Sequence, residues 1–340
     1  MTPKRQKNSA FMLLCALSIL PCLSGCGDEK GASLQSATIP VARYELTVPA
    51  MKPAATTATA AATPAGLSSE QIDKLFASLD FNREYGFLRT LASEDFQGRR
   101  TGSAGGAAAA GYISSRFSAL GLQPWTALGL DSYSQHFAAA GLESDNIAGV
   151  LPGASDDSSF IILAAHYDHL GLNGSGQAYN GADDNAAGVA AVLEVASIFQ
   201  QTGIRPSKSI VFCAFSGEEE GQLGSAALGR LIANSDLAGS VEMINIDGIG
   251  ATGGDYFGVW DEGFTGAAPL VEALQEAGRQ LSTPVREEGT DIGSDAQSFD
   301  WQYSIPAVTV DWSWGSDASL WHPYYHTIYD DAEQINKQVM

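Results

Sequence analysis

Cysteine is scarce in this sequence, and its scarcity excludes several kinds of site. The chain has four cysteines in 340 residues, and three of them, Cys15, Cys22 and Cys26, lie near the N-terminus. Cys213 stands alone in an apolar run and is predicted to be a small core residue. Cys15 and Cys22 lie in an expected signal peptide, and Cys26 is expected to be acylated. A disulfide framework, a zinc–thiolate site and any other site that needs several thiols are therefore excluded.

Basic residues are also few. The sequence has 18 Lys and Arg against 39 Asp and Glu, and its formal net charge is -21. Such a balance argues against binding of nucleic acid, which requires cations to neutralise phosphates. It equally argues against docking on anionic lipid through a basic patch. Acidity of this size mainly favours solubility, and some of these carboxylates are available as metal ligands.

The apolar run near the N-terminus is too short to span a bilayer comfortably. It covers residues 11–20 and follows a basic segment at 4–7. Leu23-Ser24-Gly25-Cys26 comes next and resembles the bacterial lipobox. Residues 1–25 are therefore expected to be a lipoprotein signal peptide, with Cys26 acylated after cleavage. Ordinary signal cleavage beside an incidental cysteine is the alternative.

This leader predicts a lipid-anchored protein of the bacterial cell envelope. Gly27, rather than an aspartate, follows the cysteine, which favours the outer membrane or the periplasmic side. Residues 26–66 are rich in Ala, Thr and Pro and are expected to form the acylated cysteine and a flexible tether. Ser68-Ser69-Glu70 has the form of a helix cap, so a single folded domain is expected over residues 67–340.

Within that domain, apolar runs of strand length alternate with helical patterns, which predicts an α/β fold with a large parallel component. The expected strands cover residues 146–151, 160–165, 209–215, 241–246, 256–260 and 305–310, and the expected helices 105–120, 185–203, 222–234 and 267–281. A final helix is expected a few residues before Met340. No internal repeat is found.

Three of the expected strands run directly into residues that can bind a metal. The run at 160–165 ends in His166, the run at 209–215 is followed by Glu218 and Glu219, and the run at 241–246 ends in Asp247. In open α/β sheets the ligand site lies beyond the carboxyl ends of the strands, so these groups should converge. Asp184 lies on the loop after the first of these strands. Taken alone, it is better explained as a helix cap.

The residue types favour a pair of metal ions. Imidazole together with carboxylates suits zinc in a catalytic site, and a metal pair needs a bridging carboxylate. The second imidazole could come from His136, His169, His322 or His326. Asp168 can orient His166, and the acids at 330–331 can orient His326.

Together these motifs resemble the bacterial co-catalytic zinc aminopeptidases, the leucyl-type aminopeptidases among clan MH metallopeptidases. The resemblance covers about residues 88–335. The matching stretches, in order, are 91–103, His166-Tyr167-Asp168, Gly181 to Gly188, Glu218 to Ser225, Asp247, and Tyr325 to Asp330. The resemblance implies a three-layer zinc-peptidase fold of the phosphorylase/hydrolase-like kind, with a mixed, largely parallel central sheet flanked by helices.

The resemblance also implies roles for the residues, with two Zn²⁺ per chain. Asp184 would bridge the metals, His166 and Asp247 would hold one zinc, and Glu219 and His326 would hold the other. The peptide bond after Asp184 would be cis. Glu218 would be the general base, and Tyr325 would stabilise the oxyanion. With Asp168 behind His166, these residues make up the expected active site.

Two departures from the family pattern are visible. Ser294-Asp295-Ala296 has alanine where many relatives carry histidine, which affects a substrate-side contact and no metal ligand. Many exported relatives also contain a protease-associated domain. About ninety residues separate position 67 from the first ligand-bearing strand, too few for that insert.

The resulting hypothesis is an exported aminopeptidase that acts on peptides with a free N-terminus, binds no nucleic acid and meets the membrane only through its lipid anchor. A glutaminyl cyclase-like acyltransferase with one zinc and a catalytically inactive peptide-binding lipoprotein are the alternatives. A dipeptidase or carboxypeptidase preference is also open, as is the oligomeric state.

Other candidate residues receive less specific predictions. Asp183 is expected to be a cap or loop acid, His136 to be structural, and His169 and His322 to lie at the site mouth or on the surface. An aromatic cluster near His326 is expected either to belong to the core or to wall the substrate pocket; its members are Trp312, Trp314, Trp321, Tyr324 and Tyr325.

Overall fold

The computed structural model describes residues 67–155, 158–289, 293–313 and 322–336. The expected signal peptide and tether, and two members of the aromatic cluster, Trp314 and Trp321, lie outside these residues. Within the described part, no helix has the length and apolar character needed to span a bilayer.

The described residues form one eight-stranded sheet with the strand order β1-β2-β4-β3-β5-β8-β6-β7. The strands are β1 (Ser134–Ala139), β2 (Leu142–Leu151), β3 (Phe160–His166), β4 (Ser209–Phe215), β5 (Val241–Ile246), β6 (Tyr256–Trp260), β7 (Val285–Gly289) and β8 (Ala307–Ser313). Strands β3, β4, β5 and β8 run parallel, as do β6 and β7, while β1/β2, β2/β4 and β6/β8 are antiparallel. The expected mixed, largely parallel sheet is confirmed.

The apolar runs at the centre of the sheet are buried on both faces. Side chains alternate across a strand, so Ile161 and Leu163 pack with Phe212 into one core, while Ile162 and Val211 belong to the core on the opposite face. A fully buried side chain of this size contributes roughly 1.5–3 kcal/mol relative to exposure. Continuous apolar strands of this kind require helices on both faces.

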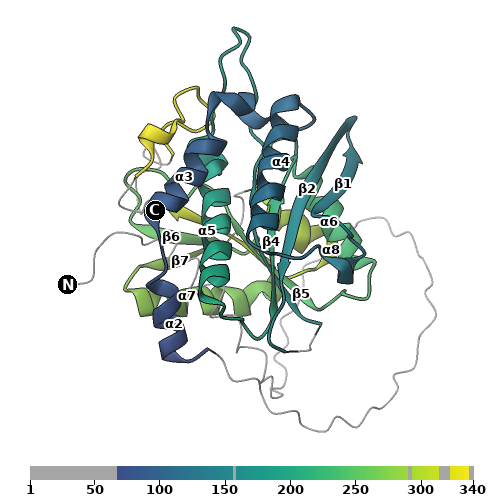
Figure 1. Cartoon of the computed structure of the whole chain (residues 1–340), viewed down its shortest axis with the longest axis vertical. Coiled ribbons are helices and arrows are strands. Elements are labelled where there is room, and N and C mark those ends of the chain that lie inside the picture. The colour runs from purple at the N-terminus through teal and green to yellow at the C-terminus, as the bar shows by residue number, and fades with distance from the viewer. Residues whose placement is uncertain (1–66, 156–157, 290–292, 314–321, 337–340) are drawn as a thin grey trace, which may run out of the picture.

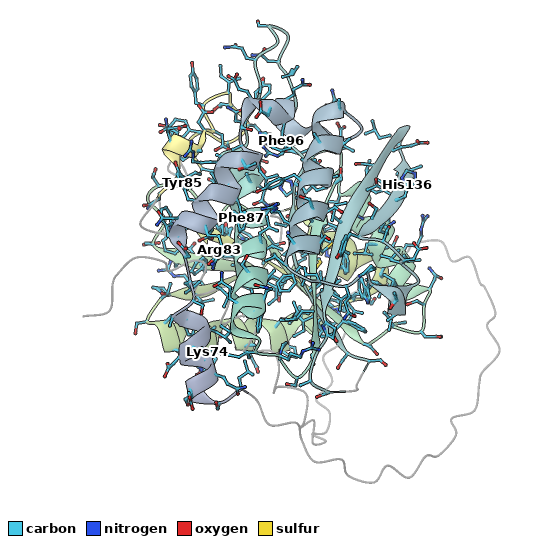
Figure 2. All side chains as sticks on the ribbon, viewed as in Figure 1. Lys74, Arg83, Tyr85, Phe87, Phe96 and His136 are labelled. Carbon is cyan, nitrogen blue, oxygen red and sulfur yellow. The ribbon has the colours of Figure 1, made fainter. Side chains whose placement is uncertain are left out.

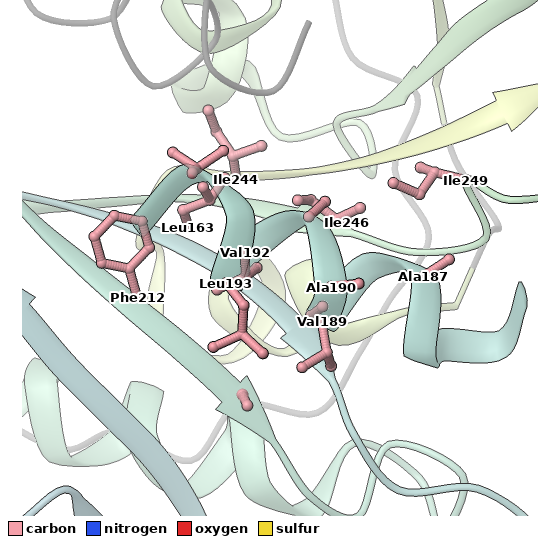
Figure 3. Close-up of a cluster of buried hydrophobic side chains, with 14 of the residues drawn as sticks. Leu163, Ala187, Val189, Ala190, Val192, Leu193, Phe212, Ile244, Ile246 and Ile249 are labelled. Carbon is pink, nitrogen blue, oxygen red and sulfur yellow. The ribbon is translucent and has the colours of Figure 1, made fainter. Parts of the chain in front are cut away.

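Helices pack on both faces of the sheet. The helices are α2 (Ser69–Phe76), α3 (Phe81–Leu91), α4 (Ala104–Ala119), α5 (Ala187–Thr202), α6 (Leu223–Ala233), α7 (Ala268–Leu281) and α8 (Asp295–Tyr303). Buried residues of α3, α4, α5 and α7 share one core cluster, and those of α6 and α8 share the other (Figure 1). Figure 3 shows part of this cluster, in which Val189 and Leu193 of α5 are buried together with Leu163 of β3 and Phe212 of β4. The three-layer fold is thus confirmed.

Local sequence signals set several helix ends. Ser68 and Gln71 form a capping box at the start of α2, with each side chain accepting a bond from the other's backbone N–H. Helix α5 stops where Gly203 adopts the left-handed conformation, with φ of 68°. Arg83 of α3 (Figure 2) pairs with the buried Glu194 of α5, which joins these two helices.

Some elements were not predicted from the sequence. Strand β1 and strand β7 lie at the two edges of the sheet, and β7 is mostly polar and partly exposed, so neither forms a continuous apolar run. The expected final helix is wrong for the described residues. Ala332–Gln334 form one 3-10 turn, and Ile335 is extended because its side chain is buried and the Asn336 N–H donates to the Gly250 carbonyl.

A buried carboxylate in α8 leads to a stability prediction. Asp300 is 2% exposed; its Oδ1 accepts the Ala307 N–H at 2.9 Å, and its Oδ2 has no hydrogen-bond partner within the described part of the chain. Burial raises the pKa of Asp300 to about 8. The unfolded chain ionises near the ordinary value, so folding loses stability as pH rises from about 4 to about 8.

Asp300→Asn keeps the acceptor and removes the ionisation. Its stability relative to wild type should therefore increase by about 3 kcal/mol between pH 5.5 and pH 8. Urea unfolding at both pH values measures this, with the exposed Asp73→Asn of α2 as the matched control. A difference between variant and wild type that does not change with pH would contradict the prediction.

Candidate metal centre

The predicted site residues meet at the carboxyl ends of three adjacent strands. His166 is the last residue of β3, Glu218 and Glu219 follow β4, and Asp247 follows β5. These strands are neighbours in the sheet, in the order β4-β3-β5. Asp184 reaches the same place from the turn that precedes α5. The turn is tight, and the peptide bond between Asp184 and Asn185 is cis, as the resemblance implied.

Asp184 lies between two groups of potential ligands. Its Oδ1 is 3.2 Å from His166 Nε2, which in turn is 3.3 Å from Asp247 Oδ1. Its Oδ2 is 3.1 Å from His326 Nε2, which is also 3.1 Å from Glu219 Oε2. Each oxygen of one carboxylate thus faces a separate group. The structure brings together all five predicted ligands.

These residues fit a metal pair. Ligands about 2.1 Å from a tetrahedral zinc lie roughly 3.3–3.4 Å apart, close to the separations in both groups. Asp184 Oδ2 and His326 Nε2 are buried atoms without a hydrogen-bond partner in the described residues, although they approach each other. Atoms that converge without hydrogen-bonding geometry are suited to share a cation. Imidazole and carboxylate are donors that zinc accepts.

The electrostatics of the site favour cations. Burial alone would lower the pKa of His326, but Asp184 and Glu219 raise it to about 10. Burial likewise acts against the charged form of His166, yet Asp247 and neighbouring acids raise its pKa well above the usual value. An excess of carboxylates therefore surrounds both imidazoles. Each imidazole must be deprotonated to bind a metal, so metal binding competes with protons here.

Glu218 lies beside the two groups. It lines a cavity of about 80 Å³ together with Asp184, Asp247, Gly248, Gly293, His322 and Tyr325. Burial raises the pKa of Glu218 well above its usual value, partly opposed by the charge of His166. A nearby metal ion would act in the opposite direction and favour the carboxylate.

Asp168 supports the site differently from the expected way. His166 Nδ1 meets the backbone carbonyl of Asp168 at 3.2 Å, whereas the nearest carboxylate oxygen is 3.7 Å away. The Asp168 carboxylate instead accepts N–H bonds from Glu218 and Glu219, at 3.3 and 3.4 Å, and the Thr101 hydroxyl at 2.8 Å. Asp168 therefore holds the backbone of the Glu218–Glu219 segment in addition to contacting His166.

Asp330 also differs from expectation. Its carboxylate accepts the backbone N–H groups of Asp183 and Asp184, at 2.9 and 3.1 Å, and no contact from it to His326 is found among the described residues. Asp331 accepts a bond from Asn180 Nδ2. Both acids thus fix the loop that carries Asp184, rather than the second imidazole.

Asp183 and His322 form a buried pair, so Asp183 is more than a simple loop acid, and His322 lies at the site rather than on the surface. Asp183 Oδ2 hydrogen-bonds His322 Nδ1, and Asp183 Oδ1 accepts the Gly250 N–H at 2.7 Å. Burial disfavours the charged ring, but Asp183 raises the pKa of His322 to about 9. His322 faces the cavity but belongs to neither ligand group.

His169 is likewise not a surface residue. Its side chain is fully buried, and Nδ1 lies 2.6 Å from Glu219 Oε1. Its position three residues after His166, on the loop leaving the same strand, is the sequence signal that could have placed it in the site. His136, by contrast, is exposed on β1 at the edge of the molecule (Figure 2), where it pairs with Asp145, and takes no part in the site.

The described aromatic residues divide between the core and the cavity. Trp312 is buried and packs edge-on against Phe257, with ring centroids 4.9 Å apart. Tyr325 is 46% exposed, stacks on His326 at 3.8 Å between centroids and lines the cavity. Ala296, in α8, is fully buried in the core cluster that α6 and α8 share.

The sequence matches a family of enzymes. The profile described as Peptidase family M28 matches residues 146–340, more than half of the chain. Leupeptin-inactivating enzyme 1 of Streptomyces exfoliatus is 26% identical over 260 residues, which cover 73% of this chain and 55% of that protein. Aminopeptidase YwaD of Bacillus subtilis is 26% identical over 212 residues, 57% of this chain and 41% of its own length. The chain thus spans about half, or less, of these curated relatives.

Solved structures share the fold. A Zn-dependent exopeptidase from Parabacteroides distasonis superposes with a TM-score of 0.62 at 22% identity, covering 77% of this chain and 94% of that one. A glutaminyl cyclase from Porphyromonas gingivalis superposes with a TM-score of 0.62 at 21% identity and the same coverage. Identities this low establish the shared fold alone and do not separate a peptidase from a cyclase.

Proposed function

The chain belongs to peptidase family M28, a family of zinc metallopeptidases, and we propose that it is an exported two-zinc aminopeptidase that removes N-terminal residues from peptides. The observation that carries this proposal is the division of the Asp184 carboxylate between two ligand groups, one with His166 and Asp247 and one with Glu219 and His326. A leucyl-type side-chain preference is part of the proposal.

Each residue has a role in this proposal. Zinc bound by the two groups would supply the Lewis acidity that makes water nucleophilic and a peptide carbonyl electrophilic. Glu218 accepts the proton of the attacking water and delivers it to the leaving amine. Tyr325, at the rim of the same cavity, donates a hydrogen bond to the developing oxyanion. The surrounding carboxylates hold the free α-amino group, which restricts the enzyme to N-termini.

Metal analysis combined with a peptide panel tests the proposal. Two zinc ions per chain are expected, with hydrolysis of leucyl and other peptides that have a free N-terminus and none of the same peptides after N-acetylation. One zinc and cyclisation of N-terminal glutamine would support a glutaminyl cyclase instead. Full metal occupancy without turnover of any peptide would support a peptide-binding protein.

The two histidines of the 322–326 segment should differ in their effect on zinc. His326→Ala removes a nitrogen that faces Asp184 and Glu219, so zinc content should fall towards one per chain. His322→Ala removes the partner of Asp183, so it should lower stability while zinc content stays at two. Metal analysis after gel filtration gives the zinc content of both variants. The reverse pattern would reassign the second imidazole.

The proposal includes a location in the bacterial cell envelope, with Cys26 acylated. Radiolabelled palmitate should enter the wild-type protein and not Cys26→Ser, because the lipobox-like Leu23-Ser24-Gly25-Cys26 offers that thiol for acylation. Equal labelling of the two would contradict the anchor and leave the peptidase proposal untouched.

A further inference from the structure

His169 is the fourth member of the group formed by Asp184, Glu219 and His326, and nothing in the expected ligand set accounts for it. The side chain is fully buried. Nδ1 points into the group, 2.6 Å from Glu219 Oε1 and 3.6 Å from Asp184 Oδ2. The ring is in edge contact with the ring of His326, with centroids 5.7 Å apart. The question is whether His169 binds the metal or acts on a residue that does.

The distances distinguish these two roles. Two ligands on one tetrahedral zinc lie roughly 3.3–3.4 Å apart. His326 Nε2 meets this spacing, at 3.1 Å from both Asp184 Oδ2 and Glu219 Oε2. The 2.6 Å between His169 Nδ1 and Glu219 Oε1 is too short for two ligands of one ion and matches a charge-assisted hydrogen bond. The two oxygens of Glu219 therefore face different partners.

We propose that His169 is a positioning residue: its Nδ1–H donates to Glu219 Oε1 and so leaves Oε2 as the single oxygen presented to the metal shared with His326. The inference rests on the proposed two-zinc site. A hydrogen bond to the outer oxygen of a ligating carboxylate fixes its orientation, and such support typically changes metal affinity by 10–100-fold. His169 thereby sets the affinity of this zinc and leaves the zinc at His166 and Asp247 unaffected.

The rest of the His169 ring is confined in a way that suits this role. Nε2 is buried and has no hydrogen-bond partner within the described part of the chain, so Nδ1 is the polar atom through which the ring acts. On one side the ring lies against the backbone of Gly181, where an added Cβ would come within 2.6 Å of Cδ2. The close approach to Gly181 and the contact with His326 hold the imidazole in the orientation that meets Glu219.

The experiment compares three variants of the whole protein. His169→Ala removes the donor. His169→Asn replaces it with a side-chain amide that can place an N–H near the position of Nδ1. His136→Ala removes an exposed histidine far from the site and is the matched control. Competition with a chromophoric chelator gives the two zinc dissociation constants, and the visible spectrum of the Co²⁺-substituted protein reports the coordination of each ion.

In His169→Ala, one of the two dissociation constants should rise by about 10–100-fold, while the other stays within about twofold of wild type. His169→Asn should recover most of that loss, and the band of the affected Co²⁺ ion should shift in the alanine variant alone. His136→Ala should match wild type in both constants. Thermal denaturation of the metal-free proteins separates a loss of packing from a loss of metal affinity.

Several results would overturn the inference. Unchanged constants in His169→Ala would show that the ring has a packing role, and an asparagine variant as weak as alanine would show that the imidazole itself binds the metal. The two-zinc proposal fails separately, if wild-type protein binds a single ion.

Discussion

Glu218→Gln is expected to lower kcat by about 10²–10⁴-fold while both zinc ions stay bound. Adjacent side chains cannot both point at one metal ion from the same direction. Glu219 is directed towards His169 and His326, whereas Glu218 lines the cavity beside Asp184 and Asp247. Glutamine keeps the shape and size of the side chain but cannot accept the proton. Substrate binding should therefore change little, and the loss should appear in kcat rather than KM.

The run of three glutamates supplies matched controls. Glu219→Gln should lose zinc, because Oε2 of Glu219 faces His326 in the second ligand group. Glu220 lies further out and forms a partly exposed ion pair with Arg100, so Glu220→Gln should keep both zinc content and kcat. Metal analysis gives the zinc content of all three variants, and steady-state kinetics of fully metallated protein compares kcat in Glu218→Gln and Glu220→Gln. Near-wild-type kcat for Glu218→Gln would assign the proton transfer to another group at the site.

The parts of the site that were predicted from sequence are those that local patterns determine. His166, Glu218 and Asp247 each follow an apolar run, and parallel strands end at the same edge of a sheet, so their convergence follows from the fold class. The position of Asp184 follows from the helix that begins just after it. The central strands could also be predicted from the sequence, because burial on both faces of the sheet produces continuous apolar runs.

The residues that were not predicted depend on how loops approach one another. Asp183 and His322 are 139 positions apart, and no pattern within either segment indicates their pairing. His169 was ambiguous because a histidine on a loop after a strand can face solvent or the site. Strands β1 and β7 were missed because edge strands need no continuous apolar face. For the three side chains the missing information was a contact between segments distant in the sequence.

Arg99 is the clearest example of such a contact, and its removal is expected to have the largest effect on stability. It is 1% exposed, and its guanidinium donates to four backbone carbonyls: those of Tyr167, Leu91, Asn180 and Gly181, at 2.6–2.8 Å. Burial lowers the pKa of Arg99 to about 10, opposed by the charges of Asp330 and Asp184, so the group stays cationic at neutral pH. One side chain therefore joins the end of α3 to the loops that carry His166 and Asp184.

Arg99→Met fills similar space but leaves the four carbonyls without their donor and removes a buried positive charge that interacts with Asp330 and Asp184. The free energy of unfolding should fall by about 3–5 kcal/mol, the range measured when one partner of a buried charged network is removed. Arg99→Lys keeps the charge but not the planar donor arrangement, so it should recover only part of the loss. Arg89→Met, at an exposed position of α3, is the control and should change stability by less than about 0.5 kcal/mol.

Urea unfolding of the metal-free proteins isolates this effect from zinc binding. Zinc affinity should fall in parallel in Arg99→Met, because the carbonyls that lose their donor flank His166 on one side and Asp184 on the other. A loss below about 1 kcal/mol would mean that water replaces the guanidinium without cost. The loops that carry the ligands would then be held chiefly by Asp330 and Asp168, and zinc affinity should stay at its wild-type value in the same variant.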